Sequence, residues 1–129
     1  MDNAAAWITA TLKADSALNA LVGGRFFMDE APEGTVFPFV VMQQIDAVPV
    51  QNVFRDRLMD GERWQIKAVT KSKSWVTVKQ IAERIELTLH KARGSNVISS
   101  VIEFKMPMIE RDNTGTYRTM ILDFRVHTQ

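Results

Sequence analysis

Hydrophobic and polar positions alternate along residues 63–92 with two different periods, which predict a strand followed by a helix. Trp64, Ile66 and Ala68 share one parity, as expected for one face of a strand. Beyond a short polar link, apolar residues recur every three or four positions, which is typical of an amphipathic helix. This stripe consists of Val78, Ile81, Ala82, Ile85 and Leu89. Because both elements are apolar on one side, we expect them to cover each other or a third element.

Similar patterns predict one more helix and several strands. Residues 4–22 have helical spacing, with a kink expected near Ala14, because Asp15 can cap a new turn, and an end at Gly23-Gly24. Strand patterns cover residues 25–28, 36–45, 97–109 and 116–128, and Ser99 and Ser100 allow a bulge in the third. Ile98, Ile102, Phe104, Met106 and Met108 share one parity and are expected on one face, as are Met120, Leu122, Phe124 and Val126.

This order of elements predicts one α+β domain spanning residues 1–129. Its sheet should be mainly antiparallel, with four to five strands and two helices packed on one face. Residues 46–61 fit no regular element well and are interpreted as an arm or mobile loop. The flanking strands can extend outward through this stretch as a long β-hairpin, and the alternative is a plain flexible insertion.

Composition argues against several classes of protein. The chain has no cysteine, so disulfides and thiolate metal sites are excluded. No apolar run approaches a membrane span of about 20 residues, and no basic segment typical of a secretory signal follows the first Met. His90 and His127 each end a predicted element and show no metal-ligand spacing. We therefore expect no enzymatic activity, no cofactor, no metal site and no membrane partner.

Charge is balanced overall but unevenly distributed along the chain. The net charge is +1, whereas residues 1–46 carry a net charge of −4 and residues 47–93 one of +5. Such segregation can arise by chance on a solvated surface. The functional interpretation is a molecule with one acidic and one basic side, which could associate head to tail and close into a ring.

Two short stretches are candidates for contacts with a partner. They combine charged and aromatic side chains next to the central strand and helix: Phe54, Arg55, Asp56, Arg57, Lys71, Lys73 and Trp75. Trp75, at the first turn of the helix, is expected to be exposed and to suit a subunit interface. Alternatively, the stretch Arg55-Asp56-Arg57 with Phe54 and Arg63 could contact the phosphates of a nucleic acid, and Trp64 or Trp75 could stack on a base. Interleaved acidic residues argue against a dedicated groove of that kind.

The order and spacing of four segments resemble the tail completion or tail terminator proteins of long-tailed bacteriophages. The first is residues 12–26, with a helix, a capped turn, a glycine stop and a short strand. The second is the proline-started strand of residues 37–42, and the third is the central strand at residues 63–68 with its following helix. The most specific part is the ending, residues 110–112, 116–118 and 122–126. Residues 46–61 are longer and more charged than the family pattern, so no partner contact is carried over there.

The resemblance implies a structural virion protein of the tail and neck, assembled in the host bacterial cytoplasm. Six copies would form a ring that caps the tail tube, stops tube polymerisation and joins the tail to the head. Its partners would be other copies of itself, the tail tube protein and head–tail connector proteins. DNA would pass through the lumen without specific binding. The alternatives are another head–tail connector component, an adaptor or stopper, and a small nucleic-acid-binding domain.

Overall fold

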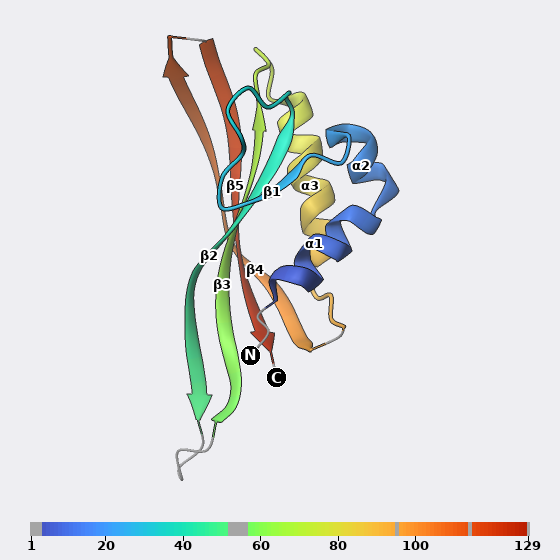
Figure 1. Ribbon diagram of the computed structural model, residues 1–129, viewed down its shortest axis with the longest axis vertical. Coiled ribbons are helices and arrows are strands. Elements are labelled where there is room, and N and C mark those ends of the chain that lie inside the picture. Colours follow the sequence, from blue (N-terminus) through green and yellow to red (C-terminus); the bar gives the residue numbers. More distant parts are fainter. Residues whose placement is uncertain (1–3, 52–56, 95, 114, 129) are drawn as a thin grey trace.

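The computed structural model describes residues 4–51, 57–94, 96–113 and 115–128 as a five-stranded sheet covered by three helices (Figure 1). The sheet has the strand order β1-β2-β3-β5-β4. In chain order the elements are α1 (Ala5–Ala14), α2 (Ser16–Val22), β1 (Phe26–Met28), β2 (Phe39–Gln51), β3 (Arg57–Thr70), α3 (Val76–Leu89), β4 (Val97–Asp112) and β5 (Gly115–Thr128).

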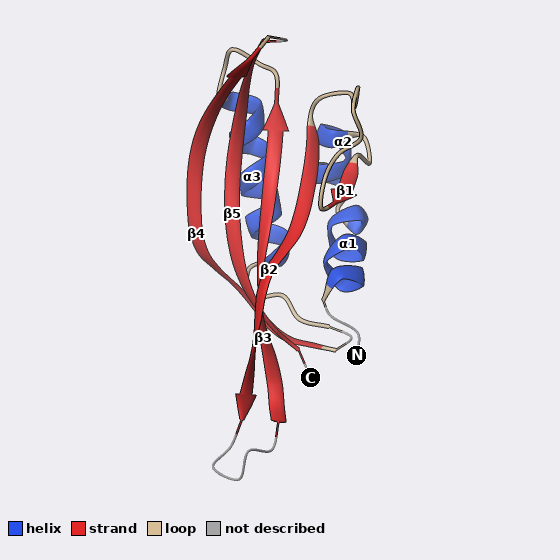
Figure 2. Ribbon diagram, turned by 60° about the vertical axis from the view of Figure 1, so that its left-hand side comes forward, coloured by secondary structure: helices blue, strands red, loops and turns tan. Residues whose placement is uncertain are grey.

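All three helices cover the same face of the sheet, and the opposite face is left open (Figure 2). The predicted α+β class is confirmed. Two details differ: the mainly antiparallel sheet includes one short parallel pair, β1 with β2, and three helices pack on it where two were expected. The parallel pair arises because the loop of residues 29–38 returns the chain to the starting end of β1 before β2 begins.

The extra helix results from a break at Asp15, where the sequence predicts a kink. Asp15 has extended backbone angles, and its Oδ2 accepts a hydrogen bond from the Leu18 N–H at 3.0 Å. This side chain therefore caps a second helix instead of continuing the first. Gly23 ends α2 in the left-handed conformation, with φ of 61°, which glycine adopts without steric cost.

The core lies between the helices and the central strands, as the pattern of residues 63–92 predicts. Trp64 and Ile66 of β3 are buried, and so are all five residues of the apolar stripe on α3. Ile8 and Leu12 of α1 add to the same cluster. On β5, the predicted inward set of Met120, Leu122, Phe124 and Val126 is confirmed.

The prediction that alternate residues of β4, from Ile98 to Met108, all lie on one face of the sheet is wrong. Two bulges interrupt its pairing with β5, one between Val97 and Ser99 and one between Ile102 and Phe104. Each bulge adds one residue to β4 and so moves the following side chains to the opposite face. Phe104 is consequently 49% exposed. The first of these bulges lies where Ser99 and Ser100 led us to expect one.

β2 and β3 form a long hairpin that extends past the helices at one end of the molecule (Figure 1). Their pairing runs from Phe39–Val69 to Gln51–Arg57. β1 accompanies β2 only at residues 40–42, and β5 accompanies β3 only as far as Asp60. Residues 46–51 and 57–61 of the predicted arm thus belong to paired strands, and residues 52–56 lie outside the described residues.

A buried carboxylate connects the start of α1 to the sheet. Glu62 is 2% exposed and lies on the same parity of β3 as Trp64. Its Oε1 accepts hydrogen bonds from the Ala4 N–H at 3.2 Å and from Trp64 Nε1 at 3.0 Å. Thr128 Oγ1, at the end of β5, donates to Oε2 at 3.2 Å. Three elements therefore meet at one side chain, and each of these donors is satisfied by the same carboxylate.

Candidate interaction surfaces

The residues predicted to contact a partner fall into two groups in the structure. Phe54, Arg55 and Asp56 lie outside the described residues. Arg57 is the first residue of β3, and its side chain is also outside the description. The backbone of Arg57 lies at the end of the hairpin that is farthest from the helices, whereas Lys71, Lys73 and Trp75 follow the other end of β3 (Figure 1).

The link between β3 and α3 is held against the start of β5. Arg118 donates from Nη1 to the Ser72 carbonyl at 2.6 Å, and its guanidinium lies 5.6 Å from the centre of the Trp75 ring. Lys71 Nζ lies 5.7 Å from the centre of the Tyr117 ring. Trp75 is half-buried and packs against the core, so it is less exposed than the sequence led us to expect. Lys73 is exposed and remains a candidate contact.

The half of the open face nearer the arm carries a network of ion pairs. Asp46 of β2 contacts Arg63 at 3.2 Å and Arg125 at 3.5 Å. Arg125 also contacts Glu103 of β4 at 3.3 Å. The network spans the sheet from β2 to β4, and its charges are matched within one chain. Exposed ion pairs add little stability, about 0–1 kcal/mol each, so these pairs mainly give this half a neutral, hydrated surface.

The other half of the open face is apolar and aromatic. Strand register places side chains of β2, β3 and β5 in adjacent rows there, including Val41, Val69 and Thr119. The Phe37 ring stacks on Tyr117 with 5.3 Å between centroids and lies 5.1 Å from the Phe39 ring. A groove of about 350 Å³ opens between these side chains, and we call it the aromatic groove.

Carboxylates line the rim of the aromatic groove. Its charged lining residues are Asp29, Glu30, Glu110, Asp112 and Lys67, so four carboxylates face one ammonium group. Asp29 and Glu30 come from the loop after β1, and Glu110 and Asp112 from the end of β4. The acidic character predicted for the first 46 residues is thus reinforced by a segment distant in sequence. Only strand register could have revealed that combination.

The outer surface of the helices, which we call the helical layer, has a different character. A shallow groove between α2 and α3 is lined by Ala17, Ala20, Leu21 and Leu87 together with polar residues of α3. Leu87 is 71% exposed. Apart from Lys79, which points into the hollow between α3 and the sheet, the exposed charged residues of α1 to α3 and the turn that follows are Lys13, Glu83, Lys91 and Arg93. Three of these four are basic, so the helical layer is opposite in charge to the aromatic groove.

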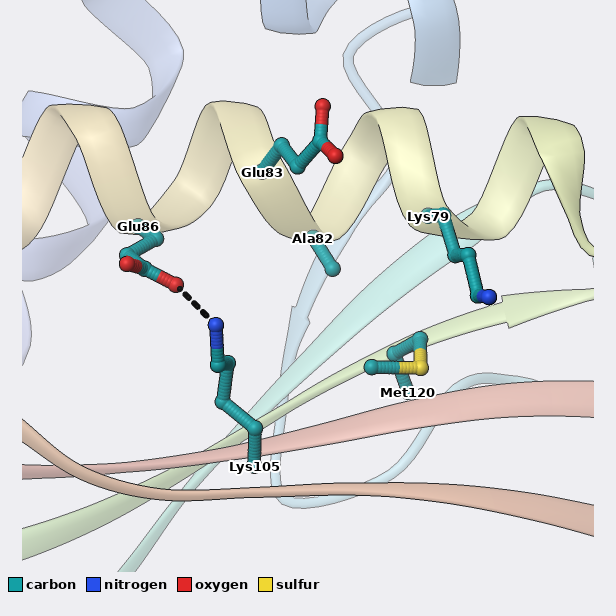
Figure 3. A pocket seen from close by; sticks show the side chains of 6 residues that line it. All are labelled: Lys79, Ala82, Glu83, Glu86, Lys105 and Met120. Carbon is teal, nitrogen blue, oxygen red and sulfur yellow. Dashed lines mark hydrogen bonds and ion pairs between the residues drawn. The ribbon is translucent and has the colours of Figure 1, made fainter.

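A third hollow lies between α3 and the edge of the sheet (Figure 3). Met120 and Ala82 form its apolar floor, and Lys105 of β4 reaches across to Glu86 of α3 at 3.0 Å. Lys79 and Glu83 complete the rim. The ion pair closes one end of a hollow of about 200 Å³, so this site is a seam between helix and sheet rather than an open binding pocket.

Catalytic or metal chemistry finds little support among the described residues. They contain no cluster of three or more side chains of the types that bind metal. Ser99 Oγ and His127 Nδ1 lie 3.2 Å apart as cross-strand neighbours, a contact that sequence spacing did not suggest. His127 Nε2 lies beside Gly61: a Cβ added to Gly61 would be 3.4 Å from this nitrogen. The nitrogen thus faces backbone, whereas a catalytic base is usually oriented by a third polar group such as a carboxylate. In the part of the chain that the structure describes, no helix is long and apolar enough to cross a membrane.

Asp15 also joins α2 to α3 through a two-pronged ion pair. Arg84 donates from Nε to Oδ2 and from Nη2 to Oδ1, both at 2.7 Å. The hydrogen bond from Arg84 lowers the pKa of Asp15; burial opposes this shift, and the Leu18 N–H reinforces it. The same contact raises the pKa of Arg84. The Asp15 side chain, only 14% exposed, thus serves as both helix cap and link between helices.

We expect Asp15→Ala to lower the free energy of unfolding at pH 7 by about 1–2 kcal/mol, mainly through loss of the helix cap. Because the folded-state pKa of Asp15 is lowered, its stabilising effect is present above the unfolded pKa of about 3.9 and disappears as pH falls through the folded value. The difference between wild type and variant should therefore shrink below about pH 4. Urea unfolding at several pH values measures this; a difference that is constant down to pH 2 would contradict it.

Comparison with known proteins gives a family assignment. The sequence profile described as tail completion protein gp17 matches residues 6–129. No curated protein sequence matches the chain. Among solved structures, a chain from "Virion of native gene transfer agent (GTA) particle" is similar in fold, with a TM-score of 0.68. At 20% identity, the match covers 94% of this chain and 90% of that one. Because the family match spans nearly the whole sequence, the chain belongs to the gp17 family of tail completion proteins, which are structural components of the virion tail.

Proposed function

We propose that the protein is a tail terminator subunit, copies of which form a ring that caps the tail tube and joins the tail to the head. Membership of the tail completion family supports a structural role in the tail. The structural neighbour comes from a virion particle, which is consistent with assembly among other virion proteins. Six copies per ring, the tail tube protein and the head–tail connector proteins are parts of this proposal.

The observation that carries the proposal is the projecting hairpin of β2 and β3. It extends beyond the helices that cover the rest of the sheet, and its exposed apolar residues Ile45 and Val48 lie on the extended part of β2 (Figure 1). An arm of this kind can bury such residues on a neighbouring subunit or on the tube. Phe54, Arg55, Asp56 and Arg57 belong to the proposed contact surface, and Lys71, Lys73 and Trp75 form a second part of it.

A conduit for DNA should bind phosphates weakly, because tight contacts would hinder passage. The net charge of +1 is compatible with such a lumen. The closest alternative is a neighbouring head–tail connector component, an adaptor or stopper. Deleting the gene from its phage separates the two: loss of a terminator gives overlong tails and unjoined heads. Loss of a head connector gives normal tails beside leaking heads.

Charge reversal in the arm should weaken assembly without unfolding the domain. We expect Arg55→Glu combined with Arg57→Glu to reduce capping of purified tail tubes, as counted by electron microscopy, by on the order of tenfold. Thermal unfolding should be unchanged, since arginine side chains are rarely part of a hydrophobic core and surface substitutions usually change stability little. Arg111→Glu, at the exposed end of β4 away from the arm, is the matched control.

A variant that caps tubes normally would contradict the proposed role of the arm. If capping is normal while affinity for DNA falls, the result favours the small nucleic-acid-binding domain instead. The salt dependence of binding to duplex DNA provides that second measurement, because phosphate contacts produce a steep decrease in affinity with salt.

A further inference from the structure

Two surfaces on opposite faces of the domain are left uncovered by the part of the chain that the structure describes. The aromatic groove is on the open face of the sheet, and the helical layer is on the other side of the core. Figure 2 shows the sheet with all three helices on one face. Each surface combines apolar side chains with charges of one dominant sign. Phe37, Phe39 and Tyr117 supply the apolar part of the first, and Leu21 and Leu87 that of the second.

The charges of the two surfaces are complementary. Four carboxylates and one lysine line the aromatic groove, whereas three exposed basic residues outnumber Glu83 in the helical layer. Asp29, Glu30 and Glu110 form no ion pair with another described residue. The charges in the other half of the open face, by contrast, are already paired within the chain. The unmatched charge is thus concentrated where the apolar side chains are also exposed.

We infer that the aromatic groove of one copy of this chain receives the helical layer of the next copy. Contact between two grooves would oppose carboxylates, and contact between two helical layers would oppose lysines; both arrangements are repulsive. Front-to-back contact joins unlike charges and is heterologous, so repeated contacts can close into a ring. This inference rests on the proposed ring and identifies the faces that form its subunit interface, apart from the arm.

Charge reversal with rescue by mixing is the first test. Glu30→Lys with Glu110→Lys makes the groove basic, and Lys13→Glu with Lys91→Glu makes the helical layer acidic. Each double variant alone should associate on the order of tenfold or more weakly than wild type, measured by sedimentation, because like charges then meet. Mixed in equal amounts, the two variants should regain association, since both kinds of contact in an alternating oligomer again join opposite charges. Failure of the mixture to regain association, with both variants folded, would overturn the inference.

Disulfide trapping is the second test, and the absence of native cysteine makes it direct. Glu30→Cys places a thiol at the rim of the groove, and Leu87→Cys places one in the helical layer. Under mild oxidation, the two variants together should give disulfide-linked dimers, whereas each alone should remain uncrosslinked. Val101→Cys, which is exposed on β4 outside both the arm and the groove, mixed with Leu87→Cys is the matched control and should give no dimer above background. Crosslinking of Glu30→Cys with itself, equal to that of the mixture, would instead indicate groove-to-groove contact.

The outcomes for the interface and for the proposed function are distinguishable. If wild type caps tail tubes but neither test behaves as expected, the interface inference fails and the terminator role stands. If both tests succeed but tubes are never capped, the interface stands and the terminator role fails.

Discussion

Replacement of Glu62 by alanine is expected to lower the free energy of unfolding by about 3–5 kcal/mol. Its carboxylate accepts hydrogen bonds from Ala4, Trp64 and Thr128, all of which are buried. Without it, three buried donors lose their acceptor, at roughly 1–3 kcal/mol each. The start of α1 would also lose its polar attachment to the sheet. Equilibrium unfolding in urea, followed by tryptophan fluorescence, measures the change.

Glu62→Gln is the matched control, because it keeps the shape and one acceptor oxygen. The amide oxygen can still accept from Ala4 and Trp64, and its NH₂ group can donate to the Thr128 hydroxyl. We therefore expect a smaller loss, about 1–2 kcal/mol, because bonds to a charged acceptor are stronger than bonds to a neutral one. Equal losses for the two variants would show that the hydrogen-bond geometry is not what stabilises this junction.

Phe124→Ala should destabilise the fold by about 3–5 kcal/mol, the usual cost of removing a buried phenylalanine. Phe124 is fully buried on β5 and has Trp64 and Ile102 as its cross-strand neighbours. The side chain lies at the centre of the sheet, where surrounding atoms cannot easily collapse into the cavity. Thermal and urea unfolding of the variant should both report the loss.

Phe104→Ala is the comparison that tests the bulges in β4. Counting by twos from Ile102 assigns Phe104 to the same face as Ile102, whereas the bulge leaves it half-exposed and opposite Asp123. We expect a loss below about 1 kcal/mol, since little apolar surface is returned to water. A loss of stability as large as that of Phe124→Ala would mean that β4 lacks the bulge between Ile102 and Phe104. Phe104 would then lie on the same face of the sheet as Ile102.

The sequence pattern was most informative where one element carries a single uninterrupted period. The stripe on α3 and the alternation on β3 and β5 follow such periods, and their buried faces were predicted correctly. β4 was mispredicted beyond its first bulge, because a bulge shifts parity and has no reliable sequence signature. The break at Asp15 was foreseen as a kink, but only the cap geometry shows that it separates two helices.

Candidate surfaces were harder to predict, because their residues come together only through strand order. The aromatic groove combines Phe37, Val69 and Tyr117, which belong to three distant segments. Segregated charge along the chain suggested an acidic and a basic side, yet it could not reveal the contribution of Glu110 to the acidic rim. Glu62 was missed, although a carboxylate on the core parity of a strand is a detectable signal of a buried polar junction.

The interior position of β5 has a consequence for synthesis on the ribosome. β5 is the last strand of the chain, yet it lies between β3 and β4 and joins the two hairpins into one sheet. Until it emerges, β3 keeps an unpaired edge beside Trp64 and Ile66, and α3 has only part of its sheet to cover. Long-range pairing of this kind is formed late, so the nascent chain remains vulnerable to misassociation with other copies until β5 has emerged from the ribosome. The same delay prevents incomplete chains from presenting a finished sheet surface to a growing assembly.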